Sequence, residues 1–258
     1  MALDLLYPPS IYCMACGNLI DATRPYALCD ACRERFGWAN GDVCAKCGRP
    51  LRGAGARSLC AGCAGGGRLF EKGFSCVEYA DCRAVLYGFK YGGRAYYGEH
   101  IALVMRDRLL WEVFAQGGLK LDGRPADLGV DLLLPVPMYA KKERKRGYNQ
   151  ADVAGRSLAR LLALPYGAKL LKRTRDTRVM SSLSAEERGA NVKGAFALDR
   201  GGEDAVRGLR VMLVDDIFTT GSTLDACAEV LLAAGASSVK FIAFAAAGTD
   251  AGDARGAP

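Results

Sequence analysis

The chain has 258 residues, which is long enough for one large domain or for a medium and a small one. Because 50% of the residues are hydrophobic and only 24% are charged, wholesale disorder is excluded. Its net charge of +7 suits an anionic ligand. The longest apolar runs, Leu132–Pro137 and Phe241–Ala247, are far shorter than the ~18 residues of a membrane span, so no membrane insertion is expected. The first residues lack the basic and apolar stretches of a secretory signal, which predicts a cytoplasmic protein.

Eight of the 11 cysteines form a tandem repeat near the N-terminus. Each half has the pattern C-x2-C-G-x11-C-x2-C, and the four pairs are Cys13/Cys16, Cys29/Cys32, Cys44/Cys47 and Cys60/Cys63. Two Cys-x-x-Cys turns supply four thiolates to one tetrahedral metal ion, and a site with four protein ligands is structural rather than catalytic. The spacing therefore predicts a double zinc ribbon over residues 10–64, with one or two structural Zn²⁺ ions.

The spacing alone leaves the grouping of these cysteines open. The simplest arrangement places one ion on the first four cysteines and a second ion on the last four, but an interleaved arrangement satisfies the same spacing. A disulfide framework would need an oxidising compartment, and one half of the repeat could also be empty. Cys76, Cys82 and Cys227 lie outside the pattern and are expected to be small buried residues.

After a glycine-rich hinge at residues 64–67, the chain alternates between apolar runs and helical periodicity. The pattern predicts an α/β domain over residues 68–247, with a parallel sheet and flanking helices. A disordered tail is expected at 248–258. Strands are expected at Phe74–Tyr79, Val130–Val136, Leu209–Val214 and Val239–Ala245. Helices are expected at Arg83–Tyr91, Tyr97–Phe114, Asn149–Ala163 and Ser222–Ala234, and a further short helix is expected to begin with a capping box at Ser184. A polar loop is expected at Gly117–Gly129.

The positive charge of the chain is concentrated in Met138–Arg178, which holds twelve Lys and Arg against three acidic residues. Its densest part contains Lys141, Arg144, Lys145 and Arg146, directly after the second predicted strand. A solvated loop is the ordinary interpretation of such a run. Its place at the carboxyl edge of the sheet also favours a clamp for pyrophosphate or a contact surface for a nucleic-acid backbone.

The most specific motif begins where the third predicted strand meets two acidic residues, Asp215 and Asp216. A short loop and a predicted helix follow, and the loop residues are Thr219, Thr220, Gly221, Ser222 and Thr223. Ligands bind at the carboxyl ends of parallel strands, and the free N–H groups at a helix N-terminus suit a phosphate. The motif is neither a Walker A loop nor a Gly-x-Gly-x-x-Gly loop.

This string resembles the phosphoribosyl pyrophosphate (PRPP) signature of type I phosphoribosyltransferases. The resemblance implies that Asp215 and Asp216 bind the ribose hydroxyls of PRPP and are the catalytic residues, and that the Thr219–Thr223 loop holds the 5-phosphate. Mg²⁺ would accompany the pyrophosphate. Phe218 stands where the family usually has a smaller aliphatic residue.

The order of motifs along nearly the whole chain resembles the ComF/ComFC competence family. The cysteine repeat is followed by Lys90-Tyr91-Gly92-Gly93, by Pro135-Val136-Pro137 and the basic run, and by a series ending at Gly194-Ala195-Phe196. The resemblance implies DNA uptake and handling of single-stranded DNA during natural transformation, with competence helicase or channel proteins as partners. It leaves open whether the protein is a phosphoribosyltransferase; the alternatives are a nucleobase salvage enzyme and a DNA-binding module with a vestigial PRPP site.

Overall fold

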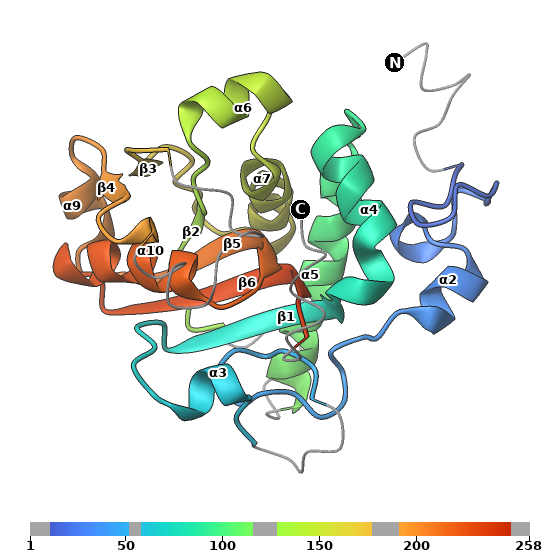
Figure 1. Ribbon diagram of the computed structural model, residues 1–258, viewed down its shortest axis with the longest axis horizontal. Coiled ribbons are helices and arrows are strands. Elements are labelled where there is room, and N and C mark those ends of the chain that lie inside the picture. The colour runs from blue at the N-terminus through green and yellow to red at the C-terminus, as the bar shows by residue number, and fades with distance from the viewer. Residues whose placement is uncertain (1–10, 52–57, 116–127, 177–190, 249–258) are drawn as a thin grey trace.

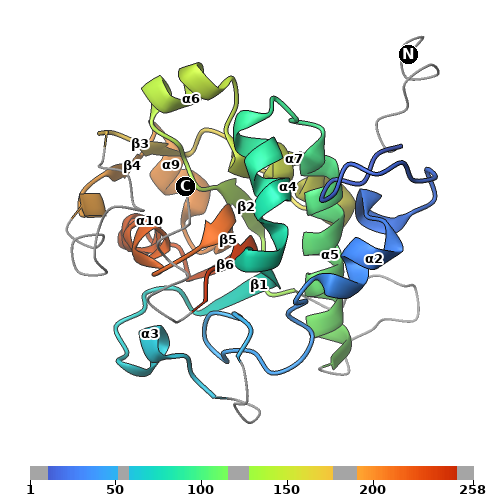
Figure 2. The same ribbon diagram turned by 45° about the vertical axis from the view of Figure 1, so that its right-hand side comes forward.

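The computed structural model describes residues 11–51, 58–115, 128–176 and 191–248 (Figures 1 and 2). Three features expected from the sequence lie outside these ranges: most of the polar loop before the second strand, the capping box at Ser184, and the tail from residue 249 onward. Within the described ranges, no helix combines the length and the apolar character needed to cross a membrane.

A four-stranded parallel sheet forms the centre of the molecule, which confirms the predicted fold class. The strand order is β1-β6-β5-β2. The central strands β5 and β6 are apolar over most of their length because both of their faces are covered. The strands are β1 (Lys72–Glu78), β2 (Leu132–Pro135), β5 (Arg210–Phe218) and β6 (Ser238–Ala246).

Helices cover the two faces of the sheet (Figure 2). The face that carries Met212 and Val214 packs against α4 (Tyr79–Tyr91), α5 (Tyr97–Ala115) and α7 (Gln150–Leu162). The face that carries Val211 and Leu213 packs against α10 (Ser222–Ala233). This alternation along β5 follows from the two-residue period of a strand.

Strand β5 is longer than the sequence predicted, and the expectation that it ends at Val214 is wrong. It continues through the acidic pair to Phe218, because Asp215 stays in register with Ala243 of β6 and Phe218 with Ala246. The continuous apolar run stops at the acids, but the backbone pairing does not. Asp215 and Asp216 therefore belong to the strand itself.

Several short elements were not predicted. Helix α6 (Ala140–Arg146) is formed by the basic run itself, so this run is a helix and not a loop, although it is solvated as that interpretation expected. None of its residues is buried, so hydrophobic periodicity carries no signal there. The other unpredicted elements are the antiparallel pair β3 (Leu171–Arg173) and β4 (Phe196–Leu198), α9 (Gly202–Val206), the 3₁₀ turn η1 (Pro25–Ala27), α2 (Asp30–Arg35) and α3 (Ala61–Ala64).

The cysteine repeat is also a repeat in space, because each half folds into the same turn. Cys13 N–H donates to Asn18 O at 2.8 Å, and Cys44 N–H donates to Arg49 O at the same distance. The two halves nevertheless occupy different places (Figure 2): the first lies beside α5, and the second lies below β1. The second half is joined to β1 by a hydrogen bond from Gly73 N to Lys46 O, 2.8 Å long.

Candidate functional site

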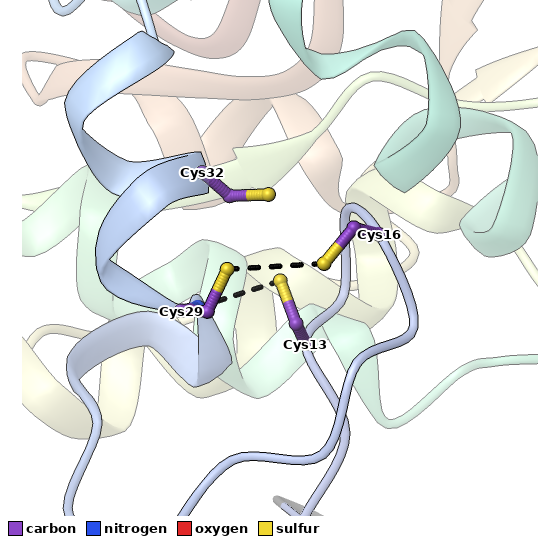
Figure 3. Close-up of side chains that lie close together, drawn as sticks. All are labelled: Cys13, Cys16, Cys29 and Cys32. Atoms are coloured by element: carbon purple, nitrogen blue, oxygen red, sulfur yellow. Dashed lines mark hydrogen bonds between the residues drawn. The ribbon is translucent and has the colours of Figure 1, made fainter.

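The eight repeat cysteines form two separate clusters, each made of one half of the repeat. In each cluster the four sulfur atoms lie within 4.8 Å of one another, and Figure 3 shows those of the first cluster, Cys13, Cys16, Cys29 and Cys32. The second cluster contains Cys44, Cys47, Cys60 and Cys63. The structure thus has the sequential grouping and not the interleaved one.

The sulfur spacing fits zinc and not disulfides. Cys16 Sγ lies 3.8 Å from Cys29 Sγ, and Cys47 Sγ lies 3.7 Å from Cys60 Sγ. A tetrahedral ion with Zn–S bonds of about 2.3 Å separates its sulfur ligands by roughly 3.8 Å, whereas a disulfide bond measures about 2.05 Å. All 11 cysteines are free, and Cys76, Cys82 and Cys227 are buried as predicted. The two four-cysteine clusters are therefore structural zinc sites.

The two clusters differ in exposure. In the first cluster Cys16 is exposed and Cys29 is half-buried, whereas all four cysteines of the second cluster are buried. The second cluster belongs to the same apolar core as β5, β6 and α10. The first cluster lies at the edge of the core on the other face of the sheet, to which its buried cysteines Cys13 and Cys32 belong. The same sequence pattern thus forms one partly exposed site and one fully buried site.

The acidic pair lies at the carboxyl end of β5, and Lys90 reaches it from α4. Strand alternation places Asp215 on the face covered by α10 and Asp216 on the face covered by α4. Lys90 Nζ lies 3.2 Å from Asp216 Oδ2, and the Lys90 side chain is only 8% exposed. The Asp216 N–H donates to Asp215 Oδ1 at 2.8 Å. Burial, and then the neighbouring Asp216 carboxylate, raise the pKa of Asp215 above its ordinary value.

The loop after β5 turns directly into α10. Gly221 has a φ of +85°, a conformation that favours glycine, and it immediately precedes the first residue of the helix. Thr220 Oγ1 and Ser222 Oγ lie 3.0 Å apart and share a hydrogen bond. Thr219, at the start of this loop, and Thr223, in the first turn of α10, are half-buried. The N-terminus of α10, with its free N–H groups and positive dipole end, is thereby placed beside the acidic pair.

Helix α6 stands next to the end of α4. The Arg146 guanidinium lies over the Tyr91 ring at 5.1 Å, and its Nη1 donates to Gln150 Oε1 at 2.7 Å. Gln150 in turn donates to the Phe89 carbonyl of α4 at 3.1 Å. Lys141, Arg144 and Lys145 make no ion pair with any other residue in the described part of the chain. The basic helix therefore lies beside the end of α4, the helix that carries Lys90.

Three cationic residues near the acids and the loop were not singled out in the sequence as site residues. Lys90 was noted only as part of a motif, and neither Arg49 nor Arg68 carries a local signal. Arg49 donates a hydrogen bond to the Thr219 carbonyl, and Arg68 Nη1 lies 2.7 Å from Asp225 Oδ2 in the first turn of α10. Each contact joins segments far apart in the chain.

Two family models match the chain and together define its class. The model described as "Double zinc ribbon domain" matches residues 2–65, and the model described as "Phosphoribosyl transferase domain" matches residues 154–256. With the two four-cysteine clusters and the parallel sheet, these matches define a double zinc ribbon joined to a domain of the phosphoribosyltransferase type.

Relatives narrow this class to one family. The chain is 30% identical over 226 residues to the DNA utilization protein YhgH of Salmonella typhi, covering 83% of this chain and 94% of the relative. It is 37% identical over 110 residues to competence protein F of Haemophilus influenzae, covering 43% of this chain and 48% of the relative. It is 26% identical over 219 residues to competence protein ComFC of Bacillus subtilis, covering 81% and 79%. The chain belongs to the ComF/ComFC competence family.

Proposed function

We propose that this protein binds PRPP with Mg²⁺ at the carboxyl end of β5, and that it handles single-stranded DNA in DNA uptake during natural transformation. One observation carries the first part: the acids Asp215 and Asp216 run without a break into a Gly221-hinged loop at the N-terminus of α10. The second part rests on the relatives, which are named as a DNA utilization protein and as competence proteins.

Each part of the site has a role that matches a part of PRPP. The N–H groups and hydroxyls of residues 219–223 would hold the 5-phosphate, as a helix N-terminus holds other phosphates. Asp215 and Asp216 would accept hydrogen bonds from the ribose hydroxyls. Lys141, Arg144, Lys145 and Arg146 would attract the pyrophosphate or a DNA backbone. Mg²⁺, when bound, would neutralise pyrophosphate oxygens, since it prefers phosphate ligands and few protein ones.

Calorimetry with PRPP and Mg²⁺ on the full chain tests the binding site. The double variant Asp215→Ala/Asp216→Ala should abolish the binding heat while the thermal unfolding transition remains cooperative. Asp199→Ala/Asp204→Ala is a matched control, because it removes two exposed acids away from the site: Asp199, directly after β4, and Asp204, in α9. Unchanged affinity in the first variant, or no heat from the wild-type protein at millimolar PRPP, would refute the assignment.

A metabolic salvage enzyme is the alternative of a different class. Such an enzyme needs PRPP and a free nucleobase, but it needs neither zinc ribbons nor an exposed basic helix. Pyrophosphate release from PRPP should therefore not increase when free purine or pyrimidine bases are added. A base-dependent release that is lost in Asp215→Ala/Asp216→Ala would favour salvage over DNA handling.

A further inference from the structure

The second cysteine cluster is connected to the loop of residues 219–223 by Arg49. This arginine follows Cys47 and Gly48 in the chain, and its side chain is buried, with 7% exposure. Its Nη2 donates a hydrogen bond to the carbonyl of Thr219, and its guanidinium lies 4.9 Å from the centre of the Phe218 ring. Phe218 stacks in turn on Phe241 of β6, with ring centres 4.9 Å apart. Arg49 thus supports the loop from the core side.

Arg68 forms a second connection between the same two parts. It donates to Gly62 O of α3 at 2.7 Å and to Asp225 Oδ2 of α10 at the same distance. Asp225 Oδ1 also accepts a hydrogen bond from Leu69 N, 3.0 Å long. Space at Gly221 is filled by this arginine, since an added Cβ would lie 2.9 Å from Arg68 Nη1. The first turn of α10 is therefore anchored to the segment that contains Cys60 and Cys63.

The charges of these arginines need a partner that the bare protein supplies only in part. Asp225 pairs with Arg68, but the buried Nε of Arg49 has no hydrogen-bond acceptor among the described residues. Arg49 lies two residues after the ligand Cys47, and Arg68 donates to the carbonyl of Gly62, between the ligands Cys60 and Cys63. Four thiolates around one Zn²⁺ carry a net charge of −2. A buried cation without a countercharge is unfavourable.

The first cluster has no comparable link to the loop among the described residues. Its neighbouring arginine, Arg35, donates to Cys32 Sγ at 3.3 Å from an exposed position on α2. The contacts of this half are made with α5 instead, for example from Tyr26 Oη to Asp107 Oδ2 at 2.7 Å. The second half of the repeat is therefore the one that contacts the loop, through Arg49.

We propose that metal at the second four-cysteine cluster holds the loop of residues 219–223 in its ligand-binding shape, with Arg49 as the positioning residue that connects them. This proposal rests on PRPP being the ligand of the loop. Without the metal, the turn of Cys44 and Cys47 that positions Arg49 is no longer held together by its four ligand bonds, so the arginine leaves the core and the Thr219 carbonyl loses its donor. PRPP binding is thus linked to metal at the second cluster and not to metal at the first.

The experiment uses the full chain and compares arginine and cysteine variants of the two halves. Arg49→Met removes the charge and keeps most of the side-chain volume, and Arg35→Met is its matched control beside the first cluster. Cys47→Ser and Cys16→Ser each remove one ligand from the second and the first cluster, respectively. The measurements are zinc content, PRPP affinity by calorimetry with Mg²⁺, and hydrogen exchange of the amides of residues 219–223 without ligand.

Arg49→Met should keep the wild-type zinc content but bind PRPP about tenfold more weakly, the loss expected of one charge-assisted hydrogen bond. Its loop amides should exchange faster, whereas Arg35→Met should match the wild type in all three measurements. Cys47→Ser should lose PRPP affinity, and Cys16→Ser should keep it. Wild-type affinity and wild-type loop exchange in Arg49→Met would overturn the proposal, even where Cys47→Ser does not fold.

Hydrogen exchange separates a failure of this proposal from a failure of the proposed function. If the wild-type protein gives no heat with PRPP, the assigned ligand is wrong, but faster exchange of the loop in Arg49→Met still supports the link between cluster and loop. If PRPP binds and the loop amides respond equally to variants of both halves, the assigned ligand stands and the link is wrong.

Discussion

Lys90 Nζ of α4 lies 3.2 Å from Asp216 Oδ2 of β5, and both side chains are largely withdrawn from solvent, with 8% and 17% exposure. The pair places a positive charge beside two adjacent carboxylates that share the end of one strand. Electrostatic repulsion between Asp215 and Asp216 is thereby reduced in the protein without ligand. The first prediction concerns this pair.

Replacing Lys90 with methionine should lower the free energy of unfolding by about 2 kcal/mol, because it leaves a largely buried carboxylate without its partner. It should also weaken PRPP binding, because an anionic ligand loses a nearby cation. Denaturant unfolding and calorimetry measure the two effects. Lys172→Met is the control: Lys172 and Asp199 are about half exposed, and breaking such a pair costs at most ~1 kcal/mol. Equal losses for the two variants would contradict the role given to Lys90.

The raised pKa of Asp215 predicts a pH dependence of stability. The folded protein keeps the proton on this carboxyl to a higher pH than the unfolded chain does, where the pKa is about 3.9. The folded state therefore binds more protons, and this group's contribution to stability falls as the pH rises above about 4. Asp215→Asn should flatten this part of the profile of unfolding free energy against pH. An identical slope in the wild type and the variant would show that Asp215 titrates normally.

Ligand binding should depend on pH in the opposite sense. The ionised carboxylate is the better acceptor for ribose hydroxyls, so PRPP affinity should increase as the pH rises through the raised pKa of Asp215. Calorimetry over a pH series at fixed Mg²⁺ measures this. Asp199→Asn is the control, because the pKa of the Asp199 carboxyl is lowered, mainly by its hydrogen bond with Lys172, and not raised. This variant should leave the dependence of PRPP affinity on pH unchanged. An affinity independent of pH would argue against direct use of Asp215.

The unequal burial of the two clusters predicts two rates of zinc release. Metal analysis should give two ions per chain, and a chelator should remove the ion of the first cluster faster, because Cys16 is exposed. Colorimetric detection of released zinc should show a fast and a slow phase. Cys16→Ser should remove the fast phase and leave the slow one. Release of both zinc ions in a single kinetic phase would mean that burial of the cysteines does not control the rate of release.

The basic helix α6 predicts salt-dependent binding of single-stranded DNA. Arg144→Ala/Lys145→Ala should weaken binding and reduce the slope of log K against log salt by about 1.4, or ~0.7 for each lost phosphate contact. Arg146 is left intact, because it also contacts Tyr91 and Gln150. Fluorescence anisotropy with an oligo-dT probe measures the slope. The control Lys172→Ala/Arg207→Ala removes the same amount of charge at exposed positions outside α6. If this control weakens DNA binding as much as the α6 variant does, α6 is not the contact surface.

Much of the fold and of the candidate site can be predicted from the sequence, because the strongest sequence signals are local. The spacing of the cysteines encodes two tetrahedral metal sites within short stretches of chain, and the string from Val211 to Thr223 contains strand, acids, loop and helix start without interruption. The apolar runs of the sheet and the periodicity of α7 are local in the same sense. The basic segment was recognised by its charge, but its helix was not, since no apolar face accompanies it.

Only the tertiary structure decided which cations serve the acids and the loop, and which half of the repeat lies behind the loop. Arg49 and Thr219 are separated by 170 residues, and no local pattern marks either as the partner of the other. The two cysteine halves share one pattern, yet one packs into the core of the sheet domain and the other keeps a cysteine at the surface. Such choices depend on which surfaces meet when the chain folds, and a pattern that repeats identically along the sequence contains no information about them.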